Sequence, residues 1–152
     1  MKVYRLARKK YPIALSGKGA AVYGNRWNSQ GIEIIYTAES RALAMAEVAV
    51  HLTIATLPSD FVMLEITIPD DITQTQLNSS ELSIGWNTFP HTTYTQHLGD
   101  IFINNQTHAI IRVPSAVVKG DYNVLINPYH PEFDLIKITS QEDFPFDERL
   151  FK

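Results

Sequence analysis

The sequence predicts an α+β fold with a mixed, mostly antiparallel sheet and flanking helices. In residues 61–68 the polar side chains of Glu65 and Thr67 lie between apolar residues at 64, 66 and 68, with the two-residue period of a strand. Two stretches, at about residues 40–52 and 92–104, carry helical patterns. Short β-rich runs follow in the C-terminal half, where Pro-Ser and Asn-Pro pairs separate them. Strands are therefore expected to dominate that half of the chain.

The N-terminal part is expected to contain two strands joined by a loop. Residues 3–6 form a short opening strand, and residues 32–36 form a second strand that ends at Tyr36. Residues 11–28, between them, carry several residues that favour turns. We therefore expect a loop that turns at Gly17, Gly19, Gly24 and Asn25.

A buried helix is expected after the second strand. Ser40, or Thr37 just before it, can cap the free backbone N–H groups of a helix that runs to about Leu52. Residues 42–50 are apolar at every position except Glu47. We expect this helix to be largely buried, with one carboxylate among small apolar side chains.

The rest of the chain is expected to form one long strand, a surface helix and three short strands. The alternating strand places its apolar residues on one face, and these are Val62, Leu64, Ile66 and Ile68. Residues 70–91 look irregular. Apolar residues with amphipathic helix spacing follow at Tyr94, Leu98, Ile101 and Phe102. The short strands are expected at residues 108–113, 122–126 and 133–138.

Size and composition indicate one domain over residues 1–152. A hydrophobic content of 45% is enough to close a core without disulfides or metals. The absence of cysteine excludes a disulfide framework, a thiolate nucleophile and a thiolate zinc site. No apolar stretch approaches the ~18 residues of a membrane span, and no signal peptide is visible. We therefore expect a soluble, cytoplasmic protein.

The charge distribution argues against a general nucleic-acid binder. The net charge is -3, whereas nucleic-acid binding through counterion release needs a broad basic face. Residues 1–32 nevertheless contain Lys and Arg but no Asp or Glu, so this segment is suited to meeting anions. The cluster of Arg8, Lys9 and Lys10 is interpreted as solvated surface charge.

The candidate chemistry lies between residues 26 and 47. A loop arginine (Arg26), a tyrosine at a strand end (Tyr36) and a helical glutamate (Glu47) are joined by short turns that allow them to meet in one cleft. Burying a lone carboxylate costs several kcal/mol unless it is paired, protonated or faces a water-filled pocket. Structural explanations stay open: a bridge from Glu47 to Arg5 or Arg26, or exposure at the helix edge. Arg26 can brace its loop, and Tyr36 can be a core aromatic with its hydroxyl on the rim.

Two other classes of site are not expected. The glycines between residues 17 and 24 have the spacing G-x-G-x-x-x-x-G and lack a preceding buried strand and a following helix, so a Rossmann site is not expected. Only His91 and His97 among the five histidines are close in sequence, and a separation of six matches no standard metal spacing. No metal is expected.

Several motifs, in the same order along nearly the whole chain, resemble the RES-domain family. They are the segments at residues 17–20, 24–28, 36–40, 44–47 with His51, 113–116, 123–128, 130–131 and 146–150. One departure is visible, because Asn25 stands where the family commonly has a second glycine before the arginine. Asparagine tolerates left-handed backbone better than most residues, so the turn is expected to survive.

This resemblance implies a toxin of a type II toxin-antitoxin pair that depletes cellular NAD+. It also implies a fold like that of the diphtheria-toxin-like ADP-ribosyltransferases. The Arg, Glu and Ser of the family name correspond to Arg26, Glu47 and Ser115, with Tyr36 on the nicotinamide side. Arg26 would clamp the pyrophosphate with paired hydrogen bonds, and Ser115 would bind phosphate or ribose.

The chemistry of NAD+ cleavage fits a single carboxylate. Nicotinamide leaves as a neutral molecule, so no general acid is needed, in contrast to an ordinary glycosidase with two carboxylates. Positive charge builds on the ribose as the bond breaks, and Glu47 would stabilise it.

Three further residues are candidates for ligand contacts. Lys18 would add charge near the phosphates, although loop lysines are usually solvated. Trp27 is interpreted as packing, with stacking on a base as the alternative. His51 lies one helical turn after Glu47 and either touches it or caps the helix end.

The partners follow from the same resemblance, whereas the acceptor is left open. Water would make the protein a glycohydrolase and inorganic phosphate, as a co-substrate, would make it a phosphorylase; no cofactor beyond the substrate NAD+ is required. The alternatives are an ADP-ribosyltransferase that modifies a host protein and a non-catalytic binding domain. The expected partners are an Xre-like antitoxin that blocks the pocket and a second copy of the chain in a homodimer.

Overall fold

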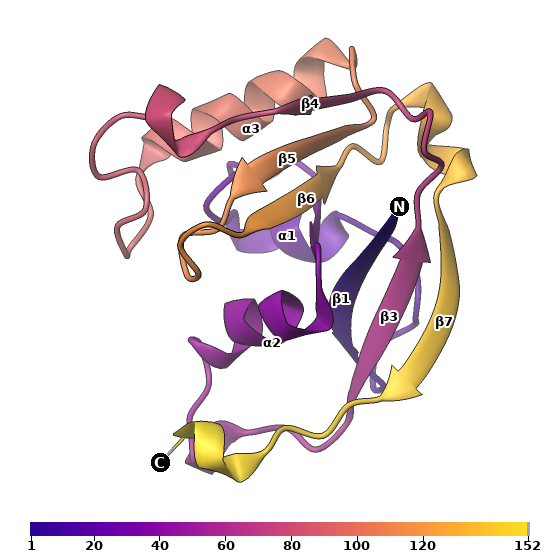
Figure 1. The fold of residues 1–152 in the computed structure, drawn as a ribbon, viewed down its shortest axis with the longest axis vertical. Helices are drawn as coiled ribbons and strands as arrows, with labels where there is room; N and C mark the ends of the chain where they lie inside the picture. The colour runs from indigo at the N-terminus through magenta and orange to yellow at the C-terminus, as the bar shows by residue number, and fades with distance from the viewer. Residues whose placement is uncertain (152) are drawn as a thin grey trace.

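The computed structural model describes residues 1–151, which form a seven-stranded sheet with three α-helices around it (Figure 1). The strand order is β4-β5-β6-β2-β1-β3-β7, and every pairing is antiparallel except the parallel pair β4–β5. The predicted α+β class with a mixed, mostly antiparallel sheet is confirmed.

The bounds of the elements are as follows. The strands are β1 (Lys2–Arg8), β2 (Ile35–Ala38), β3 (Phe61–Thr67), β4 (Gln74–Gln76), β5 (Ile110–Pro114), β6 (Tyr122–Ile126) and β7 (Lys137–Asp143). The α-helices are α1 (Lys18–Tyr23), α2 (Arg41–Ala49) and α3 (Thr93–Asn105). Short 3-10 helices are η1 (Ile54–Thr56), η2 (Ser79–Glu81), η3 (Pro131–Leu135) and η4 (Glu148–Phe151).

The sheet opens between β1 and β2. Within residues 1–151 these strands share a single paired position, Tyr4 with Ala38, whereas β1 pairs with β3 along its whole length. In Figure 1, β5 and β6 run in a different direction from β1, β3 and β7. Helix α2 lies below β5 and β6 in this view, beside β1. The opening leaves room for a cavity between the two halves of the sheet.

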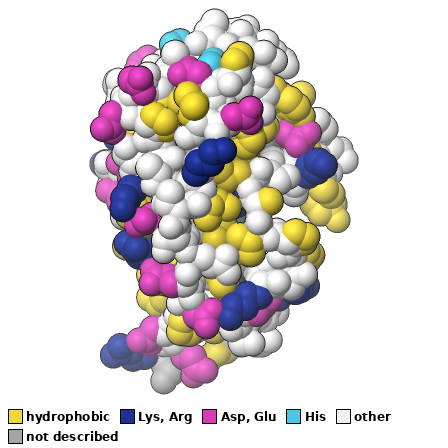
Figure 2. All heavy atoms as spheres, turned by 90° about the vertical axis from the view of Figure 1, so that its right-hand side faces the viewer, with side chains coloured by type: hydrophobic (Ala, Val, Ile, Leu, Met, Phe, Trp, Pro, Cys, Tyr) yellow, Lys and Arg dark blue, Asp and Glu magenta, His cyan; other side chains and the backbone are white. Residues whose placement is uncertain are grey.

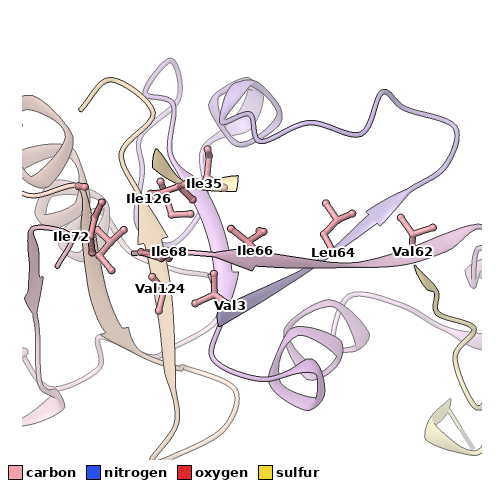
Figure 3. Packing of buried hydrophobic residues seen from close by; sticks show 12 residues of the cluster. Val3, Ile35, Val62, Leu64, Ile66, Ile68, Ile72, Val124 and Ile126 are labelled. Carbon is pink, nitrogen blue, oxygen red and sulfur yellow. The ribbon is translucent and has the colours of Figure 1, made fainter. Parts of the chain in front are cut away.

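A buried apolar cluster joins the two halves. Side chains from β1 and β3 meet side chains from β2, β5 and β6 in this cluster, as Figure 3 shows for Val3, Ile66, Ile35 and Val124. Burying such a side chain stabilises the fold by roughly 1.5–3 kcal/mol. The predicted inward face of β3 is confirmed, and its other face is also buried in part, because Met63 packs against Leu43 and Ala44 of α2.

Helix α2 begins at the predicted cap. The Ser40 hydroxyl oxygen accepts a hydrogen bond of 3.0 Å from the Leu43 backbone N–H. The helix ends at Ala49 rather than near Leu52, because the N–H groups of His51 and Leu52 turn back to carbonyls three residues earlier. The expectation of a largely buried helix was wrong: only Leu43 and Ala44 are fully buried, since one side of α2 borders a cavity.

Two N-terminal predictions need correction. The expected loop at residues 11–28 contains α1, which the buried Asn28 side chain holds by donating a 2.9 Å hydrogen bond to the Ala20 carbonyl. Strand β2 starts at Ile35 instead of residue 32, so Tyr36 lies inside it. The reason is that the partner strand β6 ends at Ile126, opposite Ile35.

Three later predictions also need correction. The region expected to be irregular contains β4, which is held by its parallel pairing with β5. The first half of the expected strand at residues 133–138 lies in η3, which begins at Pro131 after the His130 ring caps the Glu132 N–H, and β7 starts only at Lys137. Helix α3 is confirmed, but its buried face is shifted: Ile101 is exposed, and the buried residues are Thr95, Gly99, Phe102 and Ile103.

The surface carries charges of both signs. On the face in Figure 2, Lys and Arg side chains are interspersed with Asp and Glu side chains. Arg8 pairs with Asp60 and Lys9 with Asp143, which agrees with the interpretation of these cations as surface charge. No helix within residues 1–151 is long and apolar enough to cross a membrane.

Candidate active site

A cavity of about 350 Å³ lies where β1 and β2 separate. Its wall combines residues of β1, α1, β2, α2 and β6, and includes Arg5, Tyr36, Glu47 and Asn123. A cavity of this volume falls within the range of ligand-binding pockets in proteins. The structure therefore brings two of the three central sequence candidates, Tyr36 and Glu47, to the same cavity.

Glu47 is held by neutral donors. Its Oε1 atom accepts hydrogen bonds of 2.6 Å from the Ser115 hydroxyl and 2.6 Å from the Asn123 side-chain amide. None of the ion pairs formed by residues 1–151 includes Glu47. The alternative of an Arg–Glu bridge to Arg5 or Arg26 is therefore not what the structure shows, and the donors compensate the partly buried carboxylate instead.

Ser115 reaches the cavity only through Glu47. It is 5% exposed and follows Pro114 at the end of β5. Its hydroxyl oxygen accepts hydrogen bonds from the backbone N–H groups of Val117 and Val118, at 3.0 and 2.9 Å. The hydroxyl proton is therefore donated to Glu47. The donor and both acceptor positions of this hydroxyl, which was expected to bind phosphate or ribose, are all occupied by protein groups.

Arg26 lies near the cavity and braces a neighbouring loop. Its guanidinium donates hydrogen bonds of 3.0 Å to both the Trp86 and Thr88 carbonyls. Burial lowers the pKa of Arg26, while the negative charge of Glu47 raises it, so the two groups interact electrostatically. The loop-bracing role that the sequence left open is present, and the remaining guanidinium donors stay available for a ligand.

Tyr36 joins the cavity to the loop that carries Arg26. Its hydroxyl donates a 2.7 Å hydrogen bond to the Asn28 side chain and accepts a 2.9 Å bond from the Trp27 backbone N–H. Burial raises the pKa of Tyr36, so its hydroxyl is neutral at physiological pH. The hydroxyl is therefore inside the protein, not on the rim.

The other three candidates lie away from the cavity wall. Trp27 is 3% exposed and packs in the core beside Trp86, with 6.2 Å between ring centroids, in agreement with the packing interpretation. Lys18 is exposed at the start of α1. His51 is exposed beyond the end of α2, where its ring lies 6.0 Å from that of Phe89.

Sequence reasoning assigned no cavity role to Arg5 or Asn123. Arg5 donates a 3.3 Å hydrogen bond to the Tyr36 carbonyl, and burial lowers its pKa. No carboxylate of residues 1–151 pairs with it, so its positive charge is available to the cavity. The signal for Arg5 is its position between Tyr4 and Leu6 in the predicted opening strand. The position of Asn123 next to the apolar residues 124–126 of β6 is a weaker signal.

The site combines one carboxylate with two nearby arginines and an aromatic ring. Such a site suits a ligand that carries anionic groups near the arginines and develops positive charge near the carboxylate. The part of the chain that the structure describes has no cluster of three or more potential metal ligands.

Comparisons with known proteins give consistent matches. The family model described as RES domain matches residues 2–147. A Pseudomonas putida protein named "Toxin Res" is 39% identical over 139 residues, which cover 90% of this chain and 92% of that protein. A Sphingobium protein named "Prs ADP-ribosylating toxin" is 36% identical over 140 residues, which cover 91% of this chain and 87% of that protein.

A solved structure has the same fold. It is described as the crystal structure of the M. tuberculosis MbcT-MbcA toxin-antitoxin complex, and it matches with a TM-score of 0.73. The match covers 95% of this chain and 84% of the other chain, at 20% sequence identity.

Proposed function

The chain belongs to the RES domain family, and on that premise we propose that it is a toxin that cleaves the nicotinamide–ribose bond of NAD+. The observation that carries this proposal is the position of the Glu47 carboxylate, which lines a cavity together with Tyr36 and Arg5. Its negative charge also interacts with the Arg26 guanidinium. The proposal names a substrate with a pyrophosphate, a ribose and an aromatic ring that is already cationic.

Each side chain has a role in this reaction. Glu47 faces the nicotinamide ribose and stabilises the positive charge that develops when the bond breaks. The ring of Tyr36 packs against or orients the nicotinamide. Arg5 and Arg26 hold the pyrophosphate, because a planar guanidinium can donate paired hydrogen bonds to phosphate oxygens. Ser115 acts through Glu47, since its only hydroxyl proton is donated to that carboxylate.

The reaction balances without a further cofactor. The electrons of the broken carbon–nitrogen bond remain on nicotinamide, which leaves as a neutral molecule. An oxygen of water or of inorganic phosphate then bonds to the ribose carbon; an attacking water loses its proton. The products are nicotinamide with ADP-ribose, or nicotinamide with a phosphorylated ADP-ribose.

A specific observation favours a second candidate function. The Sphingobium relative is named an ADP-ribosylating toxin, and the same electrophilic ribose can be captured by a side chain of a host protein. In that case ADP-ribose would be transferred to a macromolecule instead of water or phosphate.

Product analysis tests these functions. Purified protein is incubated with NAD+, with and without inorganic phosphate, and the products are identified by mass spectrometry. Nicotinamide release is expected from the unmodified protein, and phosphate dependence distinguishes phosphorolysis from hydrolysis. A third arm adds bacterial lysate and measures ADP-ribose attached to protein.

Paired substitutions provide the control. Glu47→Gln keeps the size of the side chain but removes its charge, and a loss of at least ~100-fold in nicotinamide release is expected. Glu148→Gln makes the same change on the exposed C-terminal turn, and activity is expected to be retained. An unmodified protein that releases no nicotinamide in any arm would leave the non-catalytic binding domain as the explanation. Release that survives Glu47→Gln would instead overturn the role given to Glu47.

The proposed partners are an Xre-like antitoxin that covers the cavity and a second copy of the chain. The structural neighbour crystallised as a toxin-antitoxin complex, which supports an antitoxin partner. Co-expression with such an antitoxin is expected to relieve growth inhibition, and sedimentation of the purified protein tests the homodimer.

A further inference from the structure

We propose that Asn123 is a positioning residue that, together with Ser115, holds Glu47 by its Oε1 atom and leaves Oε2 as the oxygen that faces the substrate. This inference rests on the proposed function, since it specifies which atom of Glu47 meets the ribose. Its structural basis is the convergence of two donors on one carboxylate oxygen.

The donor role of Ser115 is determined by its other bonds. A hydroxyl has one proton and two lone pairs. Both lone pairs accept backbone N–H groups, those of Val117 and Val118. The proton is therefore donated to Glu47 Oε1, and this oxygen must act as an acceptor.

The donor role of Asn123 follows from that of Ser115. Its Nδ2 atom lies 2.6 Å from the same oxygen, whereas the opposite amide orientation would bring two acceptors together. Asn123 lies in β6 opposite Ala38 of β2, so the donor stands on a paired strand and not on a loop. The hydrogen bond ties the middle of α2 to the sheet at the cavity wall.

The two donors make the oxygens of Glu47 unequal. Oε1 accepts both bonds, while Oε2 has no hydrogen-bond partner among residues 1–151. Glu47 and Asn123 both line the cavity. A carboxylate held through one oxygen cannot rotate freely, so Oε2 is presented in one direction, and catalysis is sensitive to displacements of about 1 Å.

The first test separates turnover from substrate binding. Asn123→Ala removes one of the donors, and kcat is expected to fall by about 10- to 100-fold while KM changes by less than about 3-fold. Asn104→Ala on the exposed side of α3 is the matched control and is expected to keep both constants. An unchanged kcat in Asn123→Ala would overturn the proposal.

The second test does not depend on activity. Asn123→Asp replaces a donor 2.6 Å from Glu47 with a second carboxylate, and two carboxylates at that distance share a proton. The ¹³C signal of the Glu47 carboxyl group, assigned with Glu47→Gln, is expected to shift at neutral pH relative to the unmodified protein, whichever of the two carboxyl groups holds the shared proton. Asn104→Asp adds the same charge elsewhere and is expected to leave the signal unchanged. The positive charge of Arg26, which also acts on Glu47, is present in all these variants.

The outcomes distinguish this inference from the proposed function. If the unmodified protein releases no nicotinamide, the proposed function fails, and the ¹³C signal of Glu47 alone still decides whether Asn123 holds Glu47. An unchanged ¹³C signal of Glu47 in Asn123→Asp, with the fold intact by circular dichroism, would refute the contact. If Asn123→Asp does not fold, the kcat and KM of Asn123→Ala decide.

Discussion

The Tyr36 hydroxyl donates a 2.7 Å hydrogen bond to the Asn28 side chain and thereby ties strand β2 to the loop that carries Arg26. Asn28 is fully buried and donates in turn to the carbonyls of Ala20 and Ile32, both at 2.9 Å. The side chains of Tyr36 and the buried Asn28 therefore connect the cavity to the arginine loop. A change at either side chain is expected to affect both stability and substrate binding.

Removing the Tyr36 hydroxyl tests this connection. In Tyr36→Phe the Asn28 side chain and the Trp27 N–H lose a buried partner, so the free energy of unfolding is expected to fall by about 1–3 kcal/mol. The KM for NAD+ is expected to rise because the Arg26 loop is less restrained. Urea denaturation and steady-state kinetics measure the two effects. The control is Tyr23→Phe, at a side chain that is 87% exposed; equal losses in both variants would contradict the bracing role.

The alkaline range gives a separate prediction for Tyr36. Burial raises the pKa of Tyr36 above its ordinary value of 10.0, so the folded protein holds this proton more tightly than the unfolded chain does. The resulting stability is fully present below pH 10.0 and is lost as the pH rises above that value. The stability difference between the unmodified protein and Tyr36→Phe should therefore shrink above about pH 10 in denaturation curves. A stability difference between the two proteins that stays constant up to about pH 11.5 would contradict the raised pKa of Tyr36.

Gly99 allows α3 to dock on the arginine loop. A Cβ atom at this position would lie 1.6 Å from the Trp27 carbonyl oxygen, so Gly99→Ala forces the helix away from the core. The expected loss in unfolding free energy is more than about 3 kcal/mol, measured by thermal or urea denaturation. Gly19→Ala in α1 meets no atom within 4 Å and is expected to be neutral or stabilising by up to about 1 kcal/mol. A mild effect of Gly99→Ala would mean that α3 docks differently.

Thr95 offers a stabilising substitution. Its side-chain hydroxyl is the buried polar group without a hydrogen-bond partner among residues 1–151. Thr95→Val keeps the shape and removes the unsatisfied group, so the unfolding free energy is expected to rise by about 1 kcal/mol. Differential scanning calorimetry measures the change, with Thr93→Val on the exposed first turn of α3 as the control. A lower melting temperature for Thr95→Val would show that the hydroxyl does make a hydrogen bond.

Local signals in the sequence predicted the elements whose cause is local. Ser40 caps α2 through a bond to a residue three positions away, and the alternation in β3 expresses the period of a strand. The motif resemblance also predicted the family, which the match over residues 2–147 confirms. By contrast, β4 has no apolar alternation and exists because β5 pairs with it, and α1 is held by the Asn28 side chain.

The sequence by itself determined the fold class, the capped helix and the choice of Glu47 as the carboxylate on which a function would depend. Only the tertiary structure decided what surrounds Glu47, because its donors Ser115 and Asn123 are 68 and 76 residues away along the chain. Arg5 likewise reaches the cavity from β1, because the sheet opens next to it. Periodicity and capping act over a few residues and can be recognised in a sequence, whereas the convergence of distant side chains depends on strand register and packing.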